Sequence, residues 1–177
     1  MKKVVAFILL IILPLCLFAT SSGNMNFNVH WIINNIKTTI IEVFPYNGSG
    51  VLPQDAEEHY LKTIEPLNNS SIYNICLVKY ITNEKGTHKL GISATPMVNS
   101  ETSEEHPYSL YITYNNGFPV ELDIDPEEIE NSKTITFSVI GAGENVVNIY
   151  LDAMITDLDA MVAGQYSSIV TIARIAE

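Results

Sequence analysis

The sequence predicts an all-β protein, an antiparallel β-sandwich of about eight strands that follows an N-terminal signal peptide. Apolar and polar residues alternate with period two over many short stretches, and clusters of Gly and Asn separate these stretches. Only two short stretches have helical features. The 177 residues, 47% of them hydrophobic, suffice for one packed domain.

The first 21 residues are predicted to be a secretory signal peptide. Lys2 and Lys3 precede an apolar run over residues 4–18, and small or polar residues follow around a cleavage site after Ser21. The run is short for a membrane span, which needs ~20 apolar residues. We therefore expect an exported protein that is periplasmic, on the cell surface or extracellular.

A lipoprotein is the alternative at this end of the chain. Leu13-Pro14-Leu15-Cys16 resembles a bacterial lipobox, and a lipidated Cys16 would anchor the protein to a membrane. If the signal peptide is removed after Ser21 instead, Cys76 is the only cysteine left. No intrachain disulfide can then form, and we expect Cys76 to be a small buried apolar residue.

The charge is sparse and acidic. The chain has 9 Lys+Arg against 20 Asp+Glu, a net charge of -11. Cleavage after Ser21 removes two lysines and no acid, which makes the net charge -13. Because nucleic-acid affinity comes mainly from basic side chains that neutralise phosphates, a nucleic-acid partner is not expected.

The predicted strands are rich in β-branched and aromatic residues, which suit half-buried positions of a pleated sheet. They are residues 37–44, 72–82, 88–95, 108–114, 119–124, 134–140, 146–155 and 166–175. Asn115-Asn116-Gly117 is the strongest hairpin signal. Residues 54–61 and 157–162 have helical features but are too short to organise a domain. Residues 99–107 and 125–131 are expected to be solvated loops.

The last predicted strand follows Ala163-Gly164-Gln165-Tyr166. In immunoglobulin-like sandwiches, a tyrosine at the start of a late strand returns its hydroxyl to the backbone of the preceding corner. Gly164 and Tyr166 are therefore predicted to have a structural role, with an ordinary half-buried tyrosine after a turn as the alternative. On this basis we expect the sandwich to be immunoglobulin-like.

The closing part of the chain also resembles bacterial fimbrial subunits and spore-coat U-like secreted proteins. The resemblance covers roughly residues 132–177: an alternating strand, a Gly-rich turn, a long second strand, and Gly164-x-Tyr166-Ser167 before a final strand. It implies an exported immunoglobulin-like sandwich. In the chaperone-assembled fimbrial subunits the sandwich lacks its last strand, and a neighbour's N-terminal extension fills the gap by strand addition.

Residues 22–36 are either such an N-terminal extension or the first strand, and residues 37–177 form the β-sandwich domain that follows. The alternation that fits a donor strand consists of Met25, Phe27, Val29, Trp31 and Ile33. Pairing within its own sheet is the simpler expectation, because consecutive strands usually neighbour each other.

The candidate metal ligands are carboxylates. Asp123 and Asp125 alternate along one predicted strand, and Asp157 and Asp159 lie near the C-terminal corner. Calcium prefers several such oxygens, but a solvated acidic surface is the simpler explanation of both clusters. No other cofactor is predicted. Tyr111 is expected on the opposite face from Tyr108, where its ring would suit a protein or glycan contact. An ordinary outward-facing tyrosine is the simpler expectation.

No nucleophile elbow, phosphate loop, dinucleotide motif or zinc spacing occurs in the sequence. The expected function is therefore that of an exported, non-enzymatic surface protein. It would be a fimbria-like subunit or an adhesin-like binding module that uses β-sheet contacts with protein partners or with itself. A calcium- or carbohydrate-binding sandwich is the first alternative, and an uncharacterised hydrolase is the second.

Overall fold

The computed structural model describes residues 24–32, 39–46, 48, 59–65 and 71–175. The predicted signal peptide (residues 1–21), Cys16 and Ile33 lie outside these ranges. The described residues form a two-layer β-sandwich without any α-helix. Within the same ranges, no helix has the length and apolar character needed to cross a membrane.

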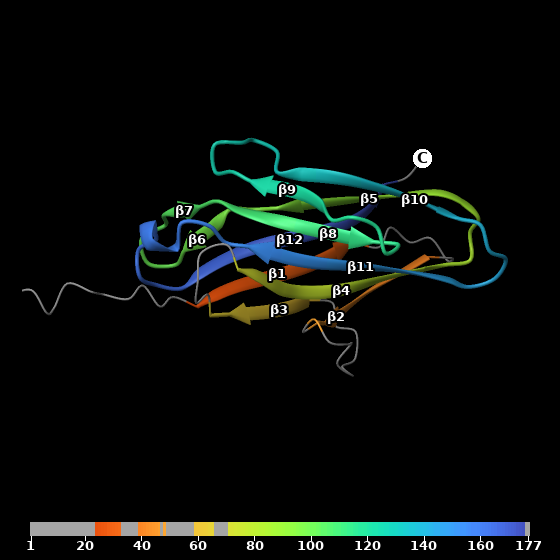
Figure 1. Cartoon of the computed structure of the whole chain (residues 1–177), viewed down its shortest axis with the longest axis horizontal. Coiled ribbons are helices and arrows are strands. Elements are labelled where there is room, and N and C mark those ends of the chain that lie inside the picture. The colour runs from red at the N-terminus through yellow and green to blue at the C-terminus, as the bar shows by residue number, and fades with distance from the viewer. Residues whose placement is uncertain (1–23, 33–38, 47, 49–58, 66–70, 176–177) are drawn as a thin grey trace, which may run out of the picture.

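Sheet A has seven strands in the order β10-β5-β12-β1-β3, with β6 attached to β12 and β7 attached to β6. Its strands are β1 (Met25–Ile32), β3 (His59–Ile64), β5 (Gly86–Ala94), β6 (Met97–Asn99), β7 (Glu105–His106), β10 (Ser132–Val139) and β12 (Tyr166–Ile175). Figure 1 views the two layers face on, so that strands of the two sheets overlap.

Sheet B has five strands in the order β2-β4-β11-β8-β9. They are β2 (Thr39–Pro45), β4 (Ile72–Thr82), β8 (Tyr108–Tyr114), β9 (Val120–Ile124) and β11 (Asn145–Met154). A short 3-10 helix, η1 (Leu158–Ala160), leads from β11 in sheet B towards β12 in sheet A.

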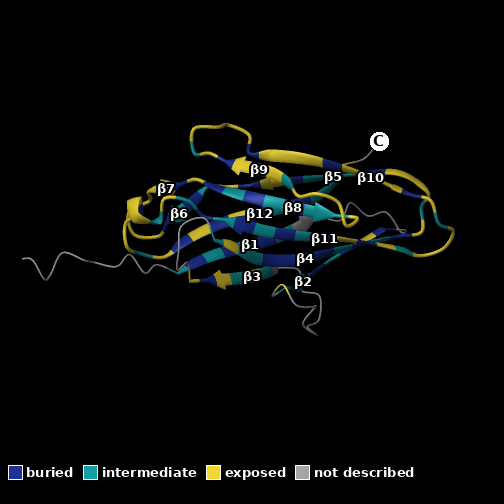
Figure 2. Cartoon of the chain, in the orientation of Figure 1, coloured by how far each residue is buried: buried dark blue, intermediate teal, exposed yellow. Residues whose placement is uncertain are grey.

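The core lies between the sheets and is built from the inward half of each alternating strand, as the period of two predicts. On β10 the inward side chains of Ile135, Phe137 and Val139 are buried, and all the remaining residues of that strand are exposed. Figure 2 shows this alternation as bands of dark blue and yellow along the strands. Tyr108 of sheet B meets Phe27 of sheet A edge to face, with 5.6 Å between ring centroids.

The predicted hairpin at Asn115-Asn116-Gly117 is confirmed and connects β8 to β9. Asn115 and Asn116 both have φ 52°, and the amide of Gly117 donates to the carbonyl of Tyr114 at 2.9 Å. Two positive-φ residues closed by this hydrogen bond fit a type I′ turn, whose twist matches that of paired strands.

The described residues form twelve strands rather than about eight. The helical expectation for residues 54–61 is wrong where the structure describes it, because residues 59–64 form β3. Residues 54–58 lie outside the described ranges. The predicted loop at residues 99–107 contains the short β6–β7 hairpin, but residues 100–105 are exposed as expected.

Candidate functional site

Sheet B carries several tyrosines and carboxylates on its outer surface, away from the core. On β11, Tyr150 and Asp152 alternate with buried Leu151 and Ala153, so they face outward. Asp152 lies opposite Tyr111 in the β-ladder. We name this surface the tyrosine face and define it by Tyr46, Tyr111, Tyr150, Glu121, Asp123 and Asp152.

Two of its tyrosines meet across an intervening strand. The ring centroids of Tyr46 and Tyr150 are 5.0 Å apart, with the planes tilted by 52°. Tyr46 directly follows β2, whereas Tyr150 is on β11, and β4 separates these strands in the sheet. The Tyr46 side chain therefore reaches over the outer surface of β4.

An apolar row supports these rings. Leu77 of β4 lies opposite Phe44 on one side and opposite Tyr150 on the other. It is only 1% exposed, although it does not belong to the core cluster between the sheets. Lys79 Nζ lies over the Phe44 ring at 4.5 Å from its centroid, which adds a cation–π contact to the row.

Each carboxylate of the tyrosine face is held by a cross-strand neighbour. Asn74 Nδ2 donates to Asp152 Oδ1 at 2.7 Å, and Tyr111 Oη donates to Glu121 Oε1 at 2.8 Å. Ser109 Oγ donates to Asp123 Oδ1 at 2.9 Å. In all three hydrogen bonds the two residues lie directly opposite each other on neighbouring strands. Because an ionised carboxylate offers about four acceptor sites, one such bond leaves it able to accept others.

The electrostatics of the tyrosine face follow from this crowding of acids. Burial raises the pKa of Asp152, and the Asn74 hydrogen bond partly opposes that rise. Burial and the nearby Asp152 charge raise the pKa of Tyr46. The pKa of Tyr111 is raised mainly by its hydrogen bond to Glu121. The local potential therefore favours neutral phenols, which can donate hydrogen bonds.

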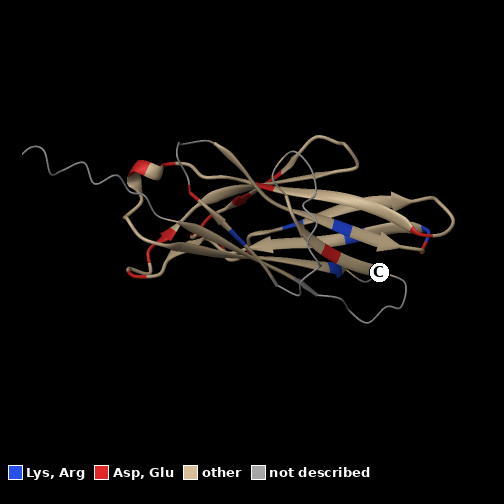
Figure 3. Ribbon diagram, turned by 90° about the horizontal axis from the view of Figure 1, so that it is seen from below, with Lys and Arg blue, Asp and Glu red and all other residues tan. Residues whose placement is uncertain are grey.

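The calcium candidates lie at two places on the sandwich, beside β9 and beside η1. Within the described ranges, no group of three or more His, Cys, Asp or Glu side chains is placed to hold a metal. Asp123 is bound to Ser109, and Asp125 Oδ1 accepts the amide of Glu127 at 2.9 Å. Asp157 precedes η1 and Asp159 lies within it; Figure 3 marks this end of the sandwich as acidic.

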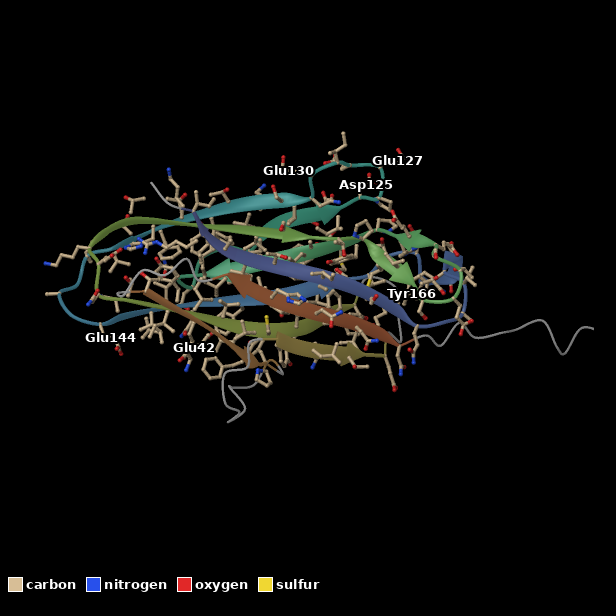
Figure 4. The ribbon with its side chains drawn as sticks, turned by 180° about the vertical axis from the view of Figure 1, so that it is seen from behind. Glu42, Asp125, Glu127, Glu130, Glu144 and Tyr166 are labelled. Carbon is tan, nitrogen blue, oxygen red and sulfur yellow. The ribbon has the colours of Figure 1, made fainter. Side chains whose placement is uncertain are left out.

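Hydrogen bonds between its first and last residues close the acidic loop of residues 125–131. Asn131 clamps Asp125 twice, since Nδ2 donates to its carbonyl and Oδ1 accepts its amide, both at 3.0 Å. Figure 4 shows Glu127 and Glu130 on this loop, at the margin of the sandwich and apart from Glu42 and Glu144. These acids have the solvated surface position that the sequence suggested.

The C-terminal corner has the hydrogen bond that the sequence interpretation requires. Tyr166 is 2% exposed, and its hydroxyl donates to the carbonyl of Val162 at 3.0 Å. Gly164 lies inside this loop with φ 154°. The amide of Tyr166 also donates to the carbonyl of Asn24 at 2.9 Å, which ties the corner to the start of β1. Figure 4 labels Tyr166 at this position.

The donor-strand candidate residues belong to a strand of this chain's own sheet. β1 lies between β12, to which it is parallel, and β3, to which it is antiparallel. Met25, Phe27 and Val29 are each at most 2% exposed and belong to the core. Trp31 pairs with Ile172 in the β1–β12 ladder, and Ile33 is outside the described residues. The structure therefore has the first-strand arrangement.

A network of polar side chains lies at one end of the core. Tyr80 Oη is 2.7 Å from His88 Nδ1, and His88 Nε2 is 3.0 Å from the carbonyl of Glu84. Because a carbonyl only accepts, Nε2 of His88 carries a proton and donates to Glu84. Arg174 then pairs with the Glu84 carboxylate at 2.7 Å and donates to Thr39 at 3.0 Å. This network links both sheets at one end of the core.

Cys76 is buried and free. Burial raises the pKa of its thiol well above the usual range, and the Asp152 charge adds to the effect. A neutral thiol in this position behaves as a small apolar side chain, as the sequence suggested.

A comparison with protein-family models gave no match, and a comparison with curated protein sequences gave none either. The functional assignment therefore depends on the residues. The sequence identified Tyr111 as outward-facing, but it did not identify Tyr46, Tyr150 or Asp152 as its partners. Period two along residues 146–155 does place Tyr150 and Asp152 on one face, whereas the approach of Tyr46 depends on the sheet order.

Proposed function

We propose that the protein is an exported, non-enzymatic β-sandwich that acts by surface contact, as an adhesin-like binding module or a fimbria-like structural subunit. The tyrosine face carries this proposal. It joins the Tyr46–Tyr150 ring pair to carboxylates held in place by neighbouring side chains. Aromatic rings with a polar edge are characteristic of binding surfaces. Export is supported by the predicted signal peptide at residues 1–21.

An immunoglobulin-like topology is part of the proposal. It is supported by the crossing from β11 in sheet B to β12 in sheet A through the Tyr166 corner. In the fimbrial subunits that the closing segment resembles, a neighbour supplies the strand beside the last one. Here β1 of the same chain occupies the place beside β12. This favours the binding module over a subunit that polymerises by donating residues 22–34.

The experiment uses the full gene in a bacterial host, with fractionation and N-terminal sequencing. We expect the protein in an exported fraction, beginning at Ser22. Labelled mature protein should bind isolated cell envelopes, and a Tyr46→Ala/Tyr150→Ala variant should bind them more weakly. Thr134→Ala/Thr136→Ala is the matched control, because it alters exposed residues of sheet A.

Retention in the cytosol, or envelope binding that the tyrosine variant leaves unchanged, would contradict the proposal. Ladders of multimers in gels of unboiled samples would favour the polymerising subunit instead. A rise in melting temperature with calcium would favour the calcium-binding alternative, because a ligand of the native state stabilises it.

A further inference from the structure

We propose that the tyrosine face binds an uncharged polysaccharide. In this arrangement the rings of Tyr46 and Tyr150 pack on sugar rings, and the carboxylates of Asp152 and Glu121 accept sugar hydroxyls. The inference rests on the proposed function, since it names the ligand class for the same surface.

The aromatic part of the face suits the apolar side of a sugar. A pyranose has faces of C–H groups and a rim of hydroxyls, so it packs on flat aromatic surfaces. Tyr46 and Tyr150 supply two such surfaces at a 52° tilt, with 5.0 Å between centroids. Leu77 is buried in the same cross-strand row as Tyr150. The rings therefore stand on a packed layer, and little conformational freedom is lost on binding.

The polar part of the face suits hydroxyl donors. Asp152, Glu121 and Asp123 each accept a hydrogen bond from a neutral group of the protein, from an amide or hydroxyl 2.7–2.9 Å away. The carboxylates are thereby oriented, and they have acceptor capacity left. Hydrogen bonds from neutral donors to charged acceptors are among the stronger ones. A polyhydroxyl ligand can extend this pattern without a change of charge.

The charge of the surface selects against a polyanion. Three carboxylates define the face, and the mature chain is predicted to carry a net charge of -13 if residues 1–21 are removed. Lys79 lies on the outer side of β4, where its ammonium group is placed over the Phe44 ring. A basic peptide is the competing class of ligand. Its cations could use the acceptor sites that the carboxylates have left, but the paired rings of Tyr46 and Tyr150 offer the flat apolar surface on which a sugar ring packs. The uncharged sugar therefore accounts for both parts of the face.

The test is an NMR titration of the full mature chain with ¹³C-labelled tyrosines. The probes are a soluble β-glucan, an α-mannan, a galactan and chitin oligomers, with heparin and poly-lysine as charged comparators. We expect at least one uncharged glycan to shift the ring signals of Tyr46, Tyr111 and Tyr150. The ring signals of Tyr108 and Tyr166 should not shift, since both are buried in the core and serve as internal controls.

Variants assign the contact. Tyr150→Ala should weaken binding of the same glycan about tenfold, the effect of losing roughly 1.4 kcal/mol of ring contact. Tyr150→Phe should bind within about twofold of the wild type, because it retains the ring. Thr136→Ala on the other sheet should have no effect. Unchanged ring signals of Tyr108 and Tyr166 in Tyr150→Ala would show that this variant is folded, so that its loss of binding reflects the missing ring.

Three outcomes would overturn the inference: no uncharged glycan shifts these rings, only heparin or poly-lysine does, or Tyr150→Ala binds as well as the wild type. Envelope binding that persists with any of these outcomes would leave the surface-contact function standing. Loss of envelope binding as well would remove both proposals.

Discussion

The side chain of Asn99 lies directly against Gly164, so that a β-carbon on Gly164 would be 2.7 Å from Asn99 Nδ2. Asn99 has no room to retreat, because it is 1% exposed and its Oδ1 accepts the amides of Glu101 and Thr102. Gly164 also has φ 154°, a conformation that side chains with a β-carbon rarely adopt. The corner before β12 therefore requires glycine on two separate grounds.

We expect Gly164→Ala to lower the free energy of unfolding by about 2–4 kcal/mol, because overpacking and backbone strain add. Chemical denaturation measures the change. Gly143→Ala is the matched control. Gly143 has φ 87°, but no atom lies within 4 Å of the position that a β-carbon would take there, so only strain is introduced. Equal losses in the two variants would contradict the role of the Asn99 contact.

Tyr166→Phe tests the hydroxyl that closes the same corner. It removes the donor to the Val162 carbonyl while leaving the buried ring in place. We expect a loss of about 1–2 kcal/mol in unfolding free energy. Tyr111→Phe removes an exposed hydroxyl from Glu121 and should cost less than about 0.5 kcal/mol. Similar losses in the two variants would show that the corner bond has no special importance.

Removal of residues 22–34 should prevent folding, because β1 contributes core side chains and pairs with two strands. Phe27→Ala is the milder form of this test. Its ring is fully buried against Tyr108, so we expect a loss of about 3–5 kcal/mol. Asn28→Ala, on the outer side of β1, is the control. A soluble, folded monomer from the truncated chain would instead support the donor-strand interpretation.

Cys76 should resist thiol reagents in the native protein. Its sulfur is buried and burial raises the pKa of the thiol, so the reactive thiolate is scarce. Labelling with a chromogenic disulfide at neutral pH should follow global unfolding, whereas denatured protein should react at once. Rapid labelling without loss of native circular dichroism would contradict this burial.

Tyr60 should make the protein sensitive to alkali. Burial, with a smaller effect from Cys76, raises the pKa of Tyr60 from 10.0 to about 12. The resulting stabilisation is complete below pH 10 and is lost as the pH rises towards 12, since the unfolded chain ionises first. Tyr60→Phe should lose less stability than the wild type between about pH 10 and 12. Asn28→Ala should retain the wild-type pH dependence, and an unchanged profile in Tyr60→Phe would refute the assignment.

The strands that the sequence predicts best are those with one buried and one exposed face. Ile135, Phe137 and Val139 illustrate this, because period two alone fixes which side chains enter the core. The Asn115-Asn116-Gly117 turn is equally predictable, since positive φ favours these residue types. Local chemistry thus specifies these elements without any tertiary information.

Long-range pairing explains what the sequence did not provide. β3 begins in a segment whose acids and Pro53 imitate a helix start, and its pairing with β1 decides its conformation. The parallel pairing of β1 with β12 joins residues more than a hundred positions apart. The Tyr46–Tyr150 contact likewise depends on β4 lying between β2 and β11. Residue patterns determine the faces of strands but not their neighbours.

The position of β1 also imposes an order on folding. β3 extends sheet A only through β1, and β1 is joined to the rest of that sheet only through β12. β12 ends at Ile175, so a growing chain cannot complete sheet A until almost all of these residues have been made. Contacts of such high sequence separation slow folding, because a long loop must close before they form. β1 therefore gains its parallel neighbour β12 only after all the other strands of sheet A have been made.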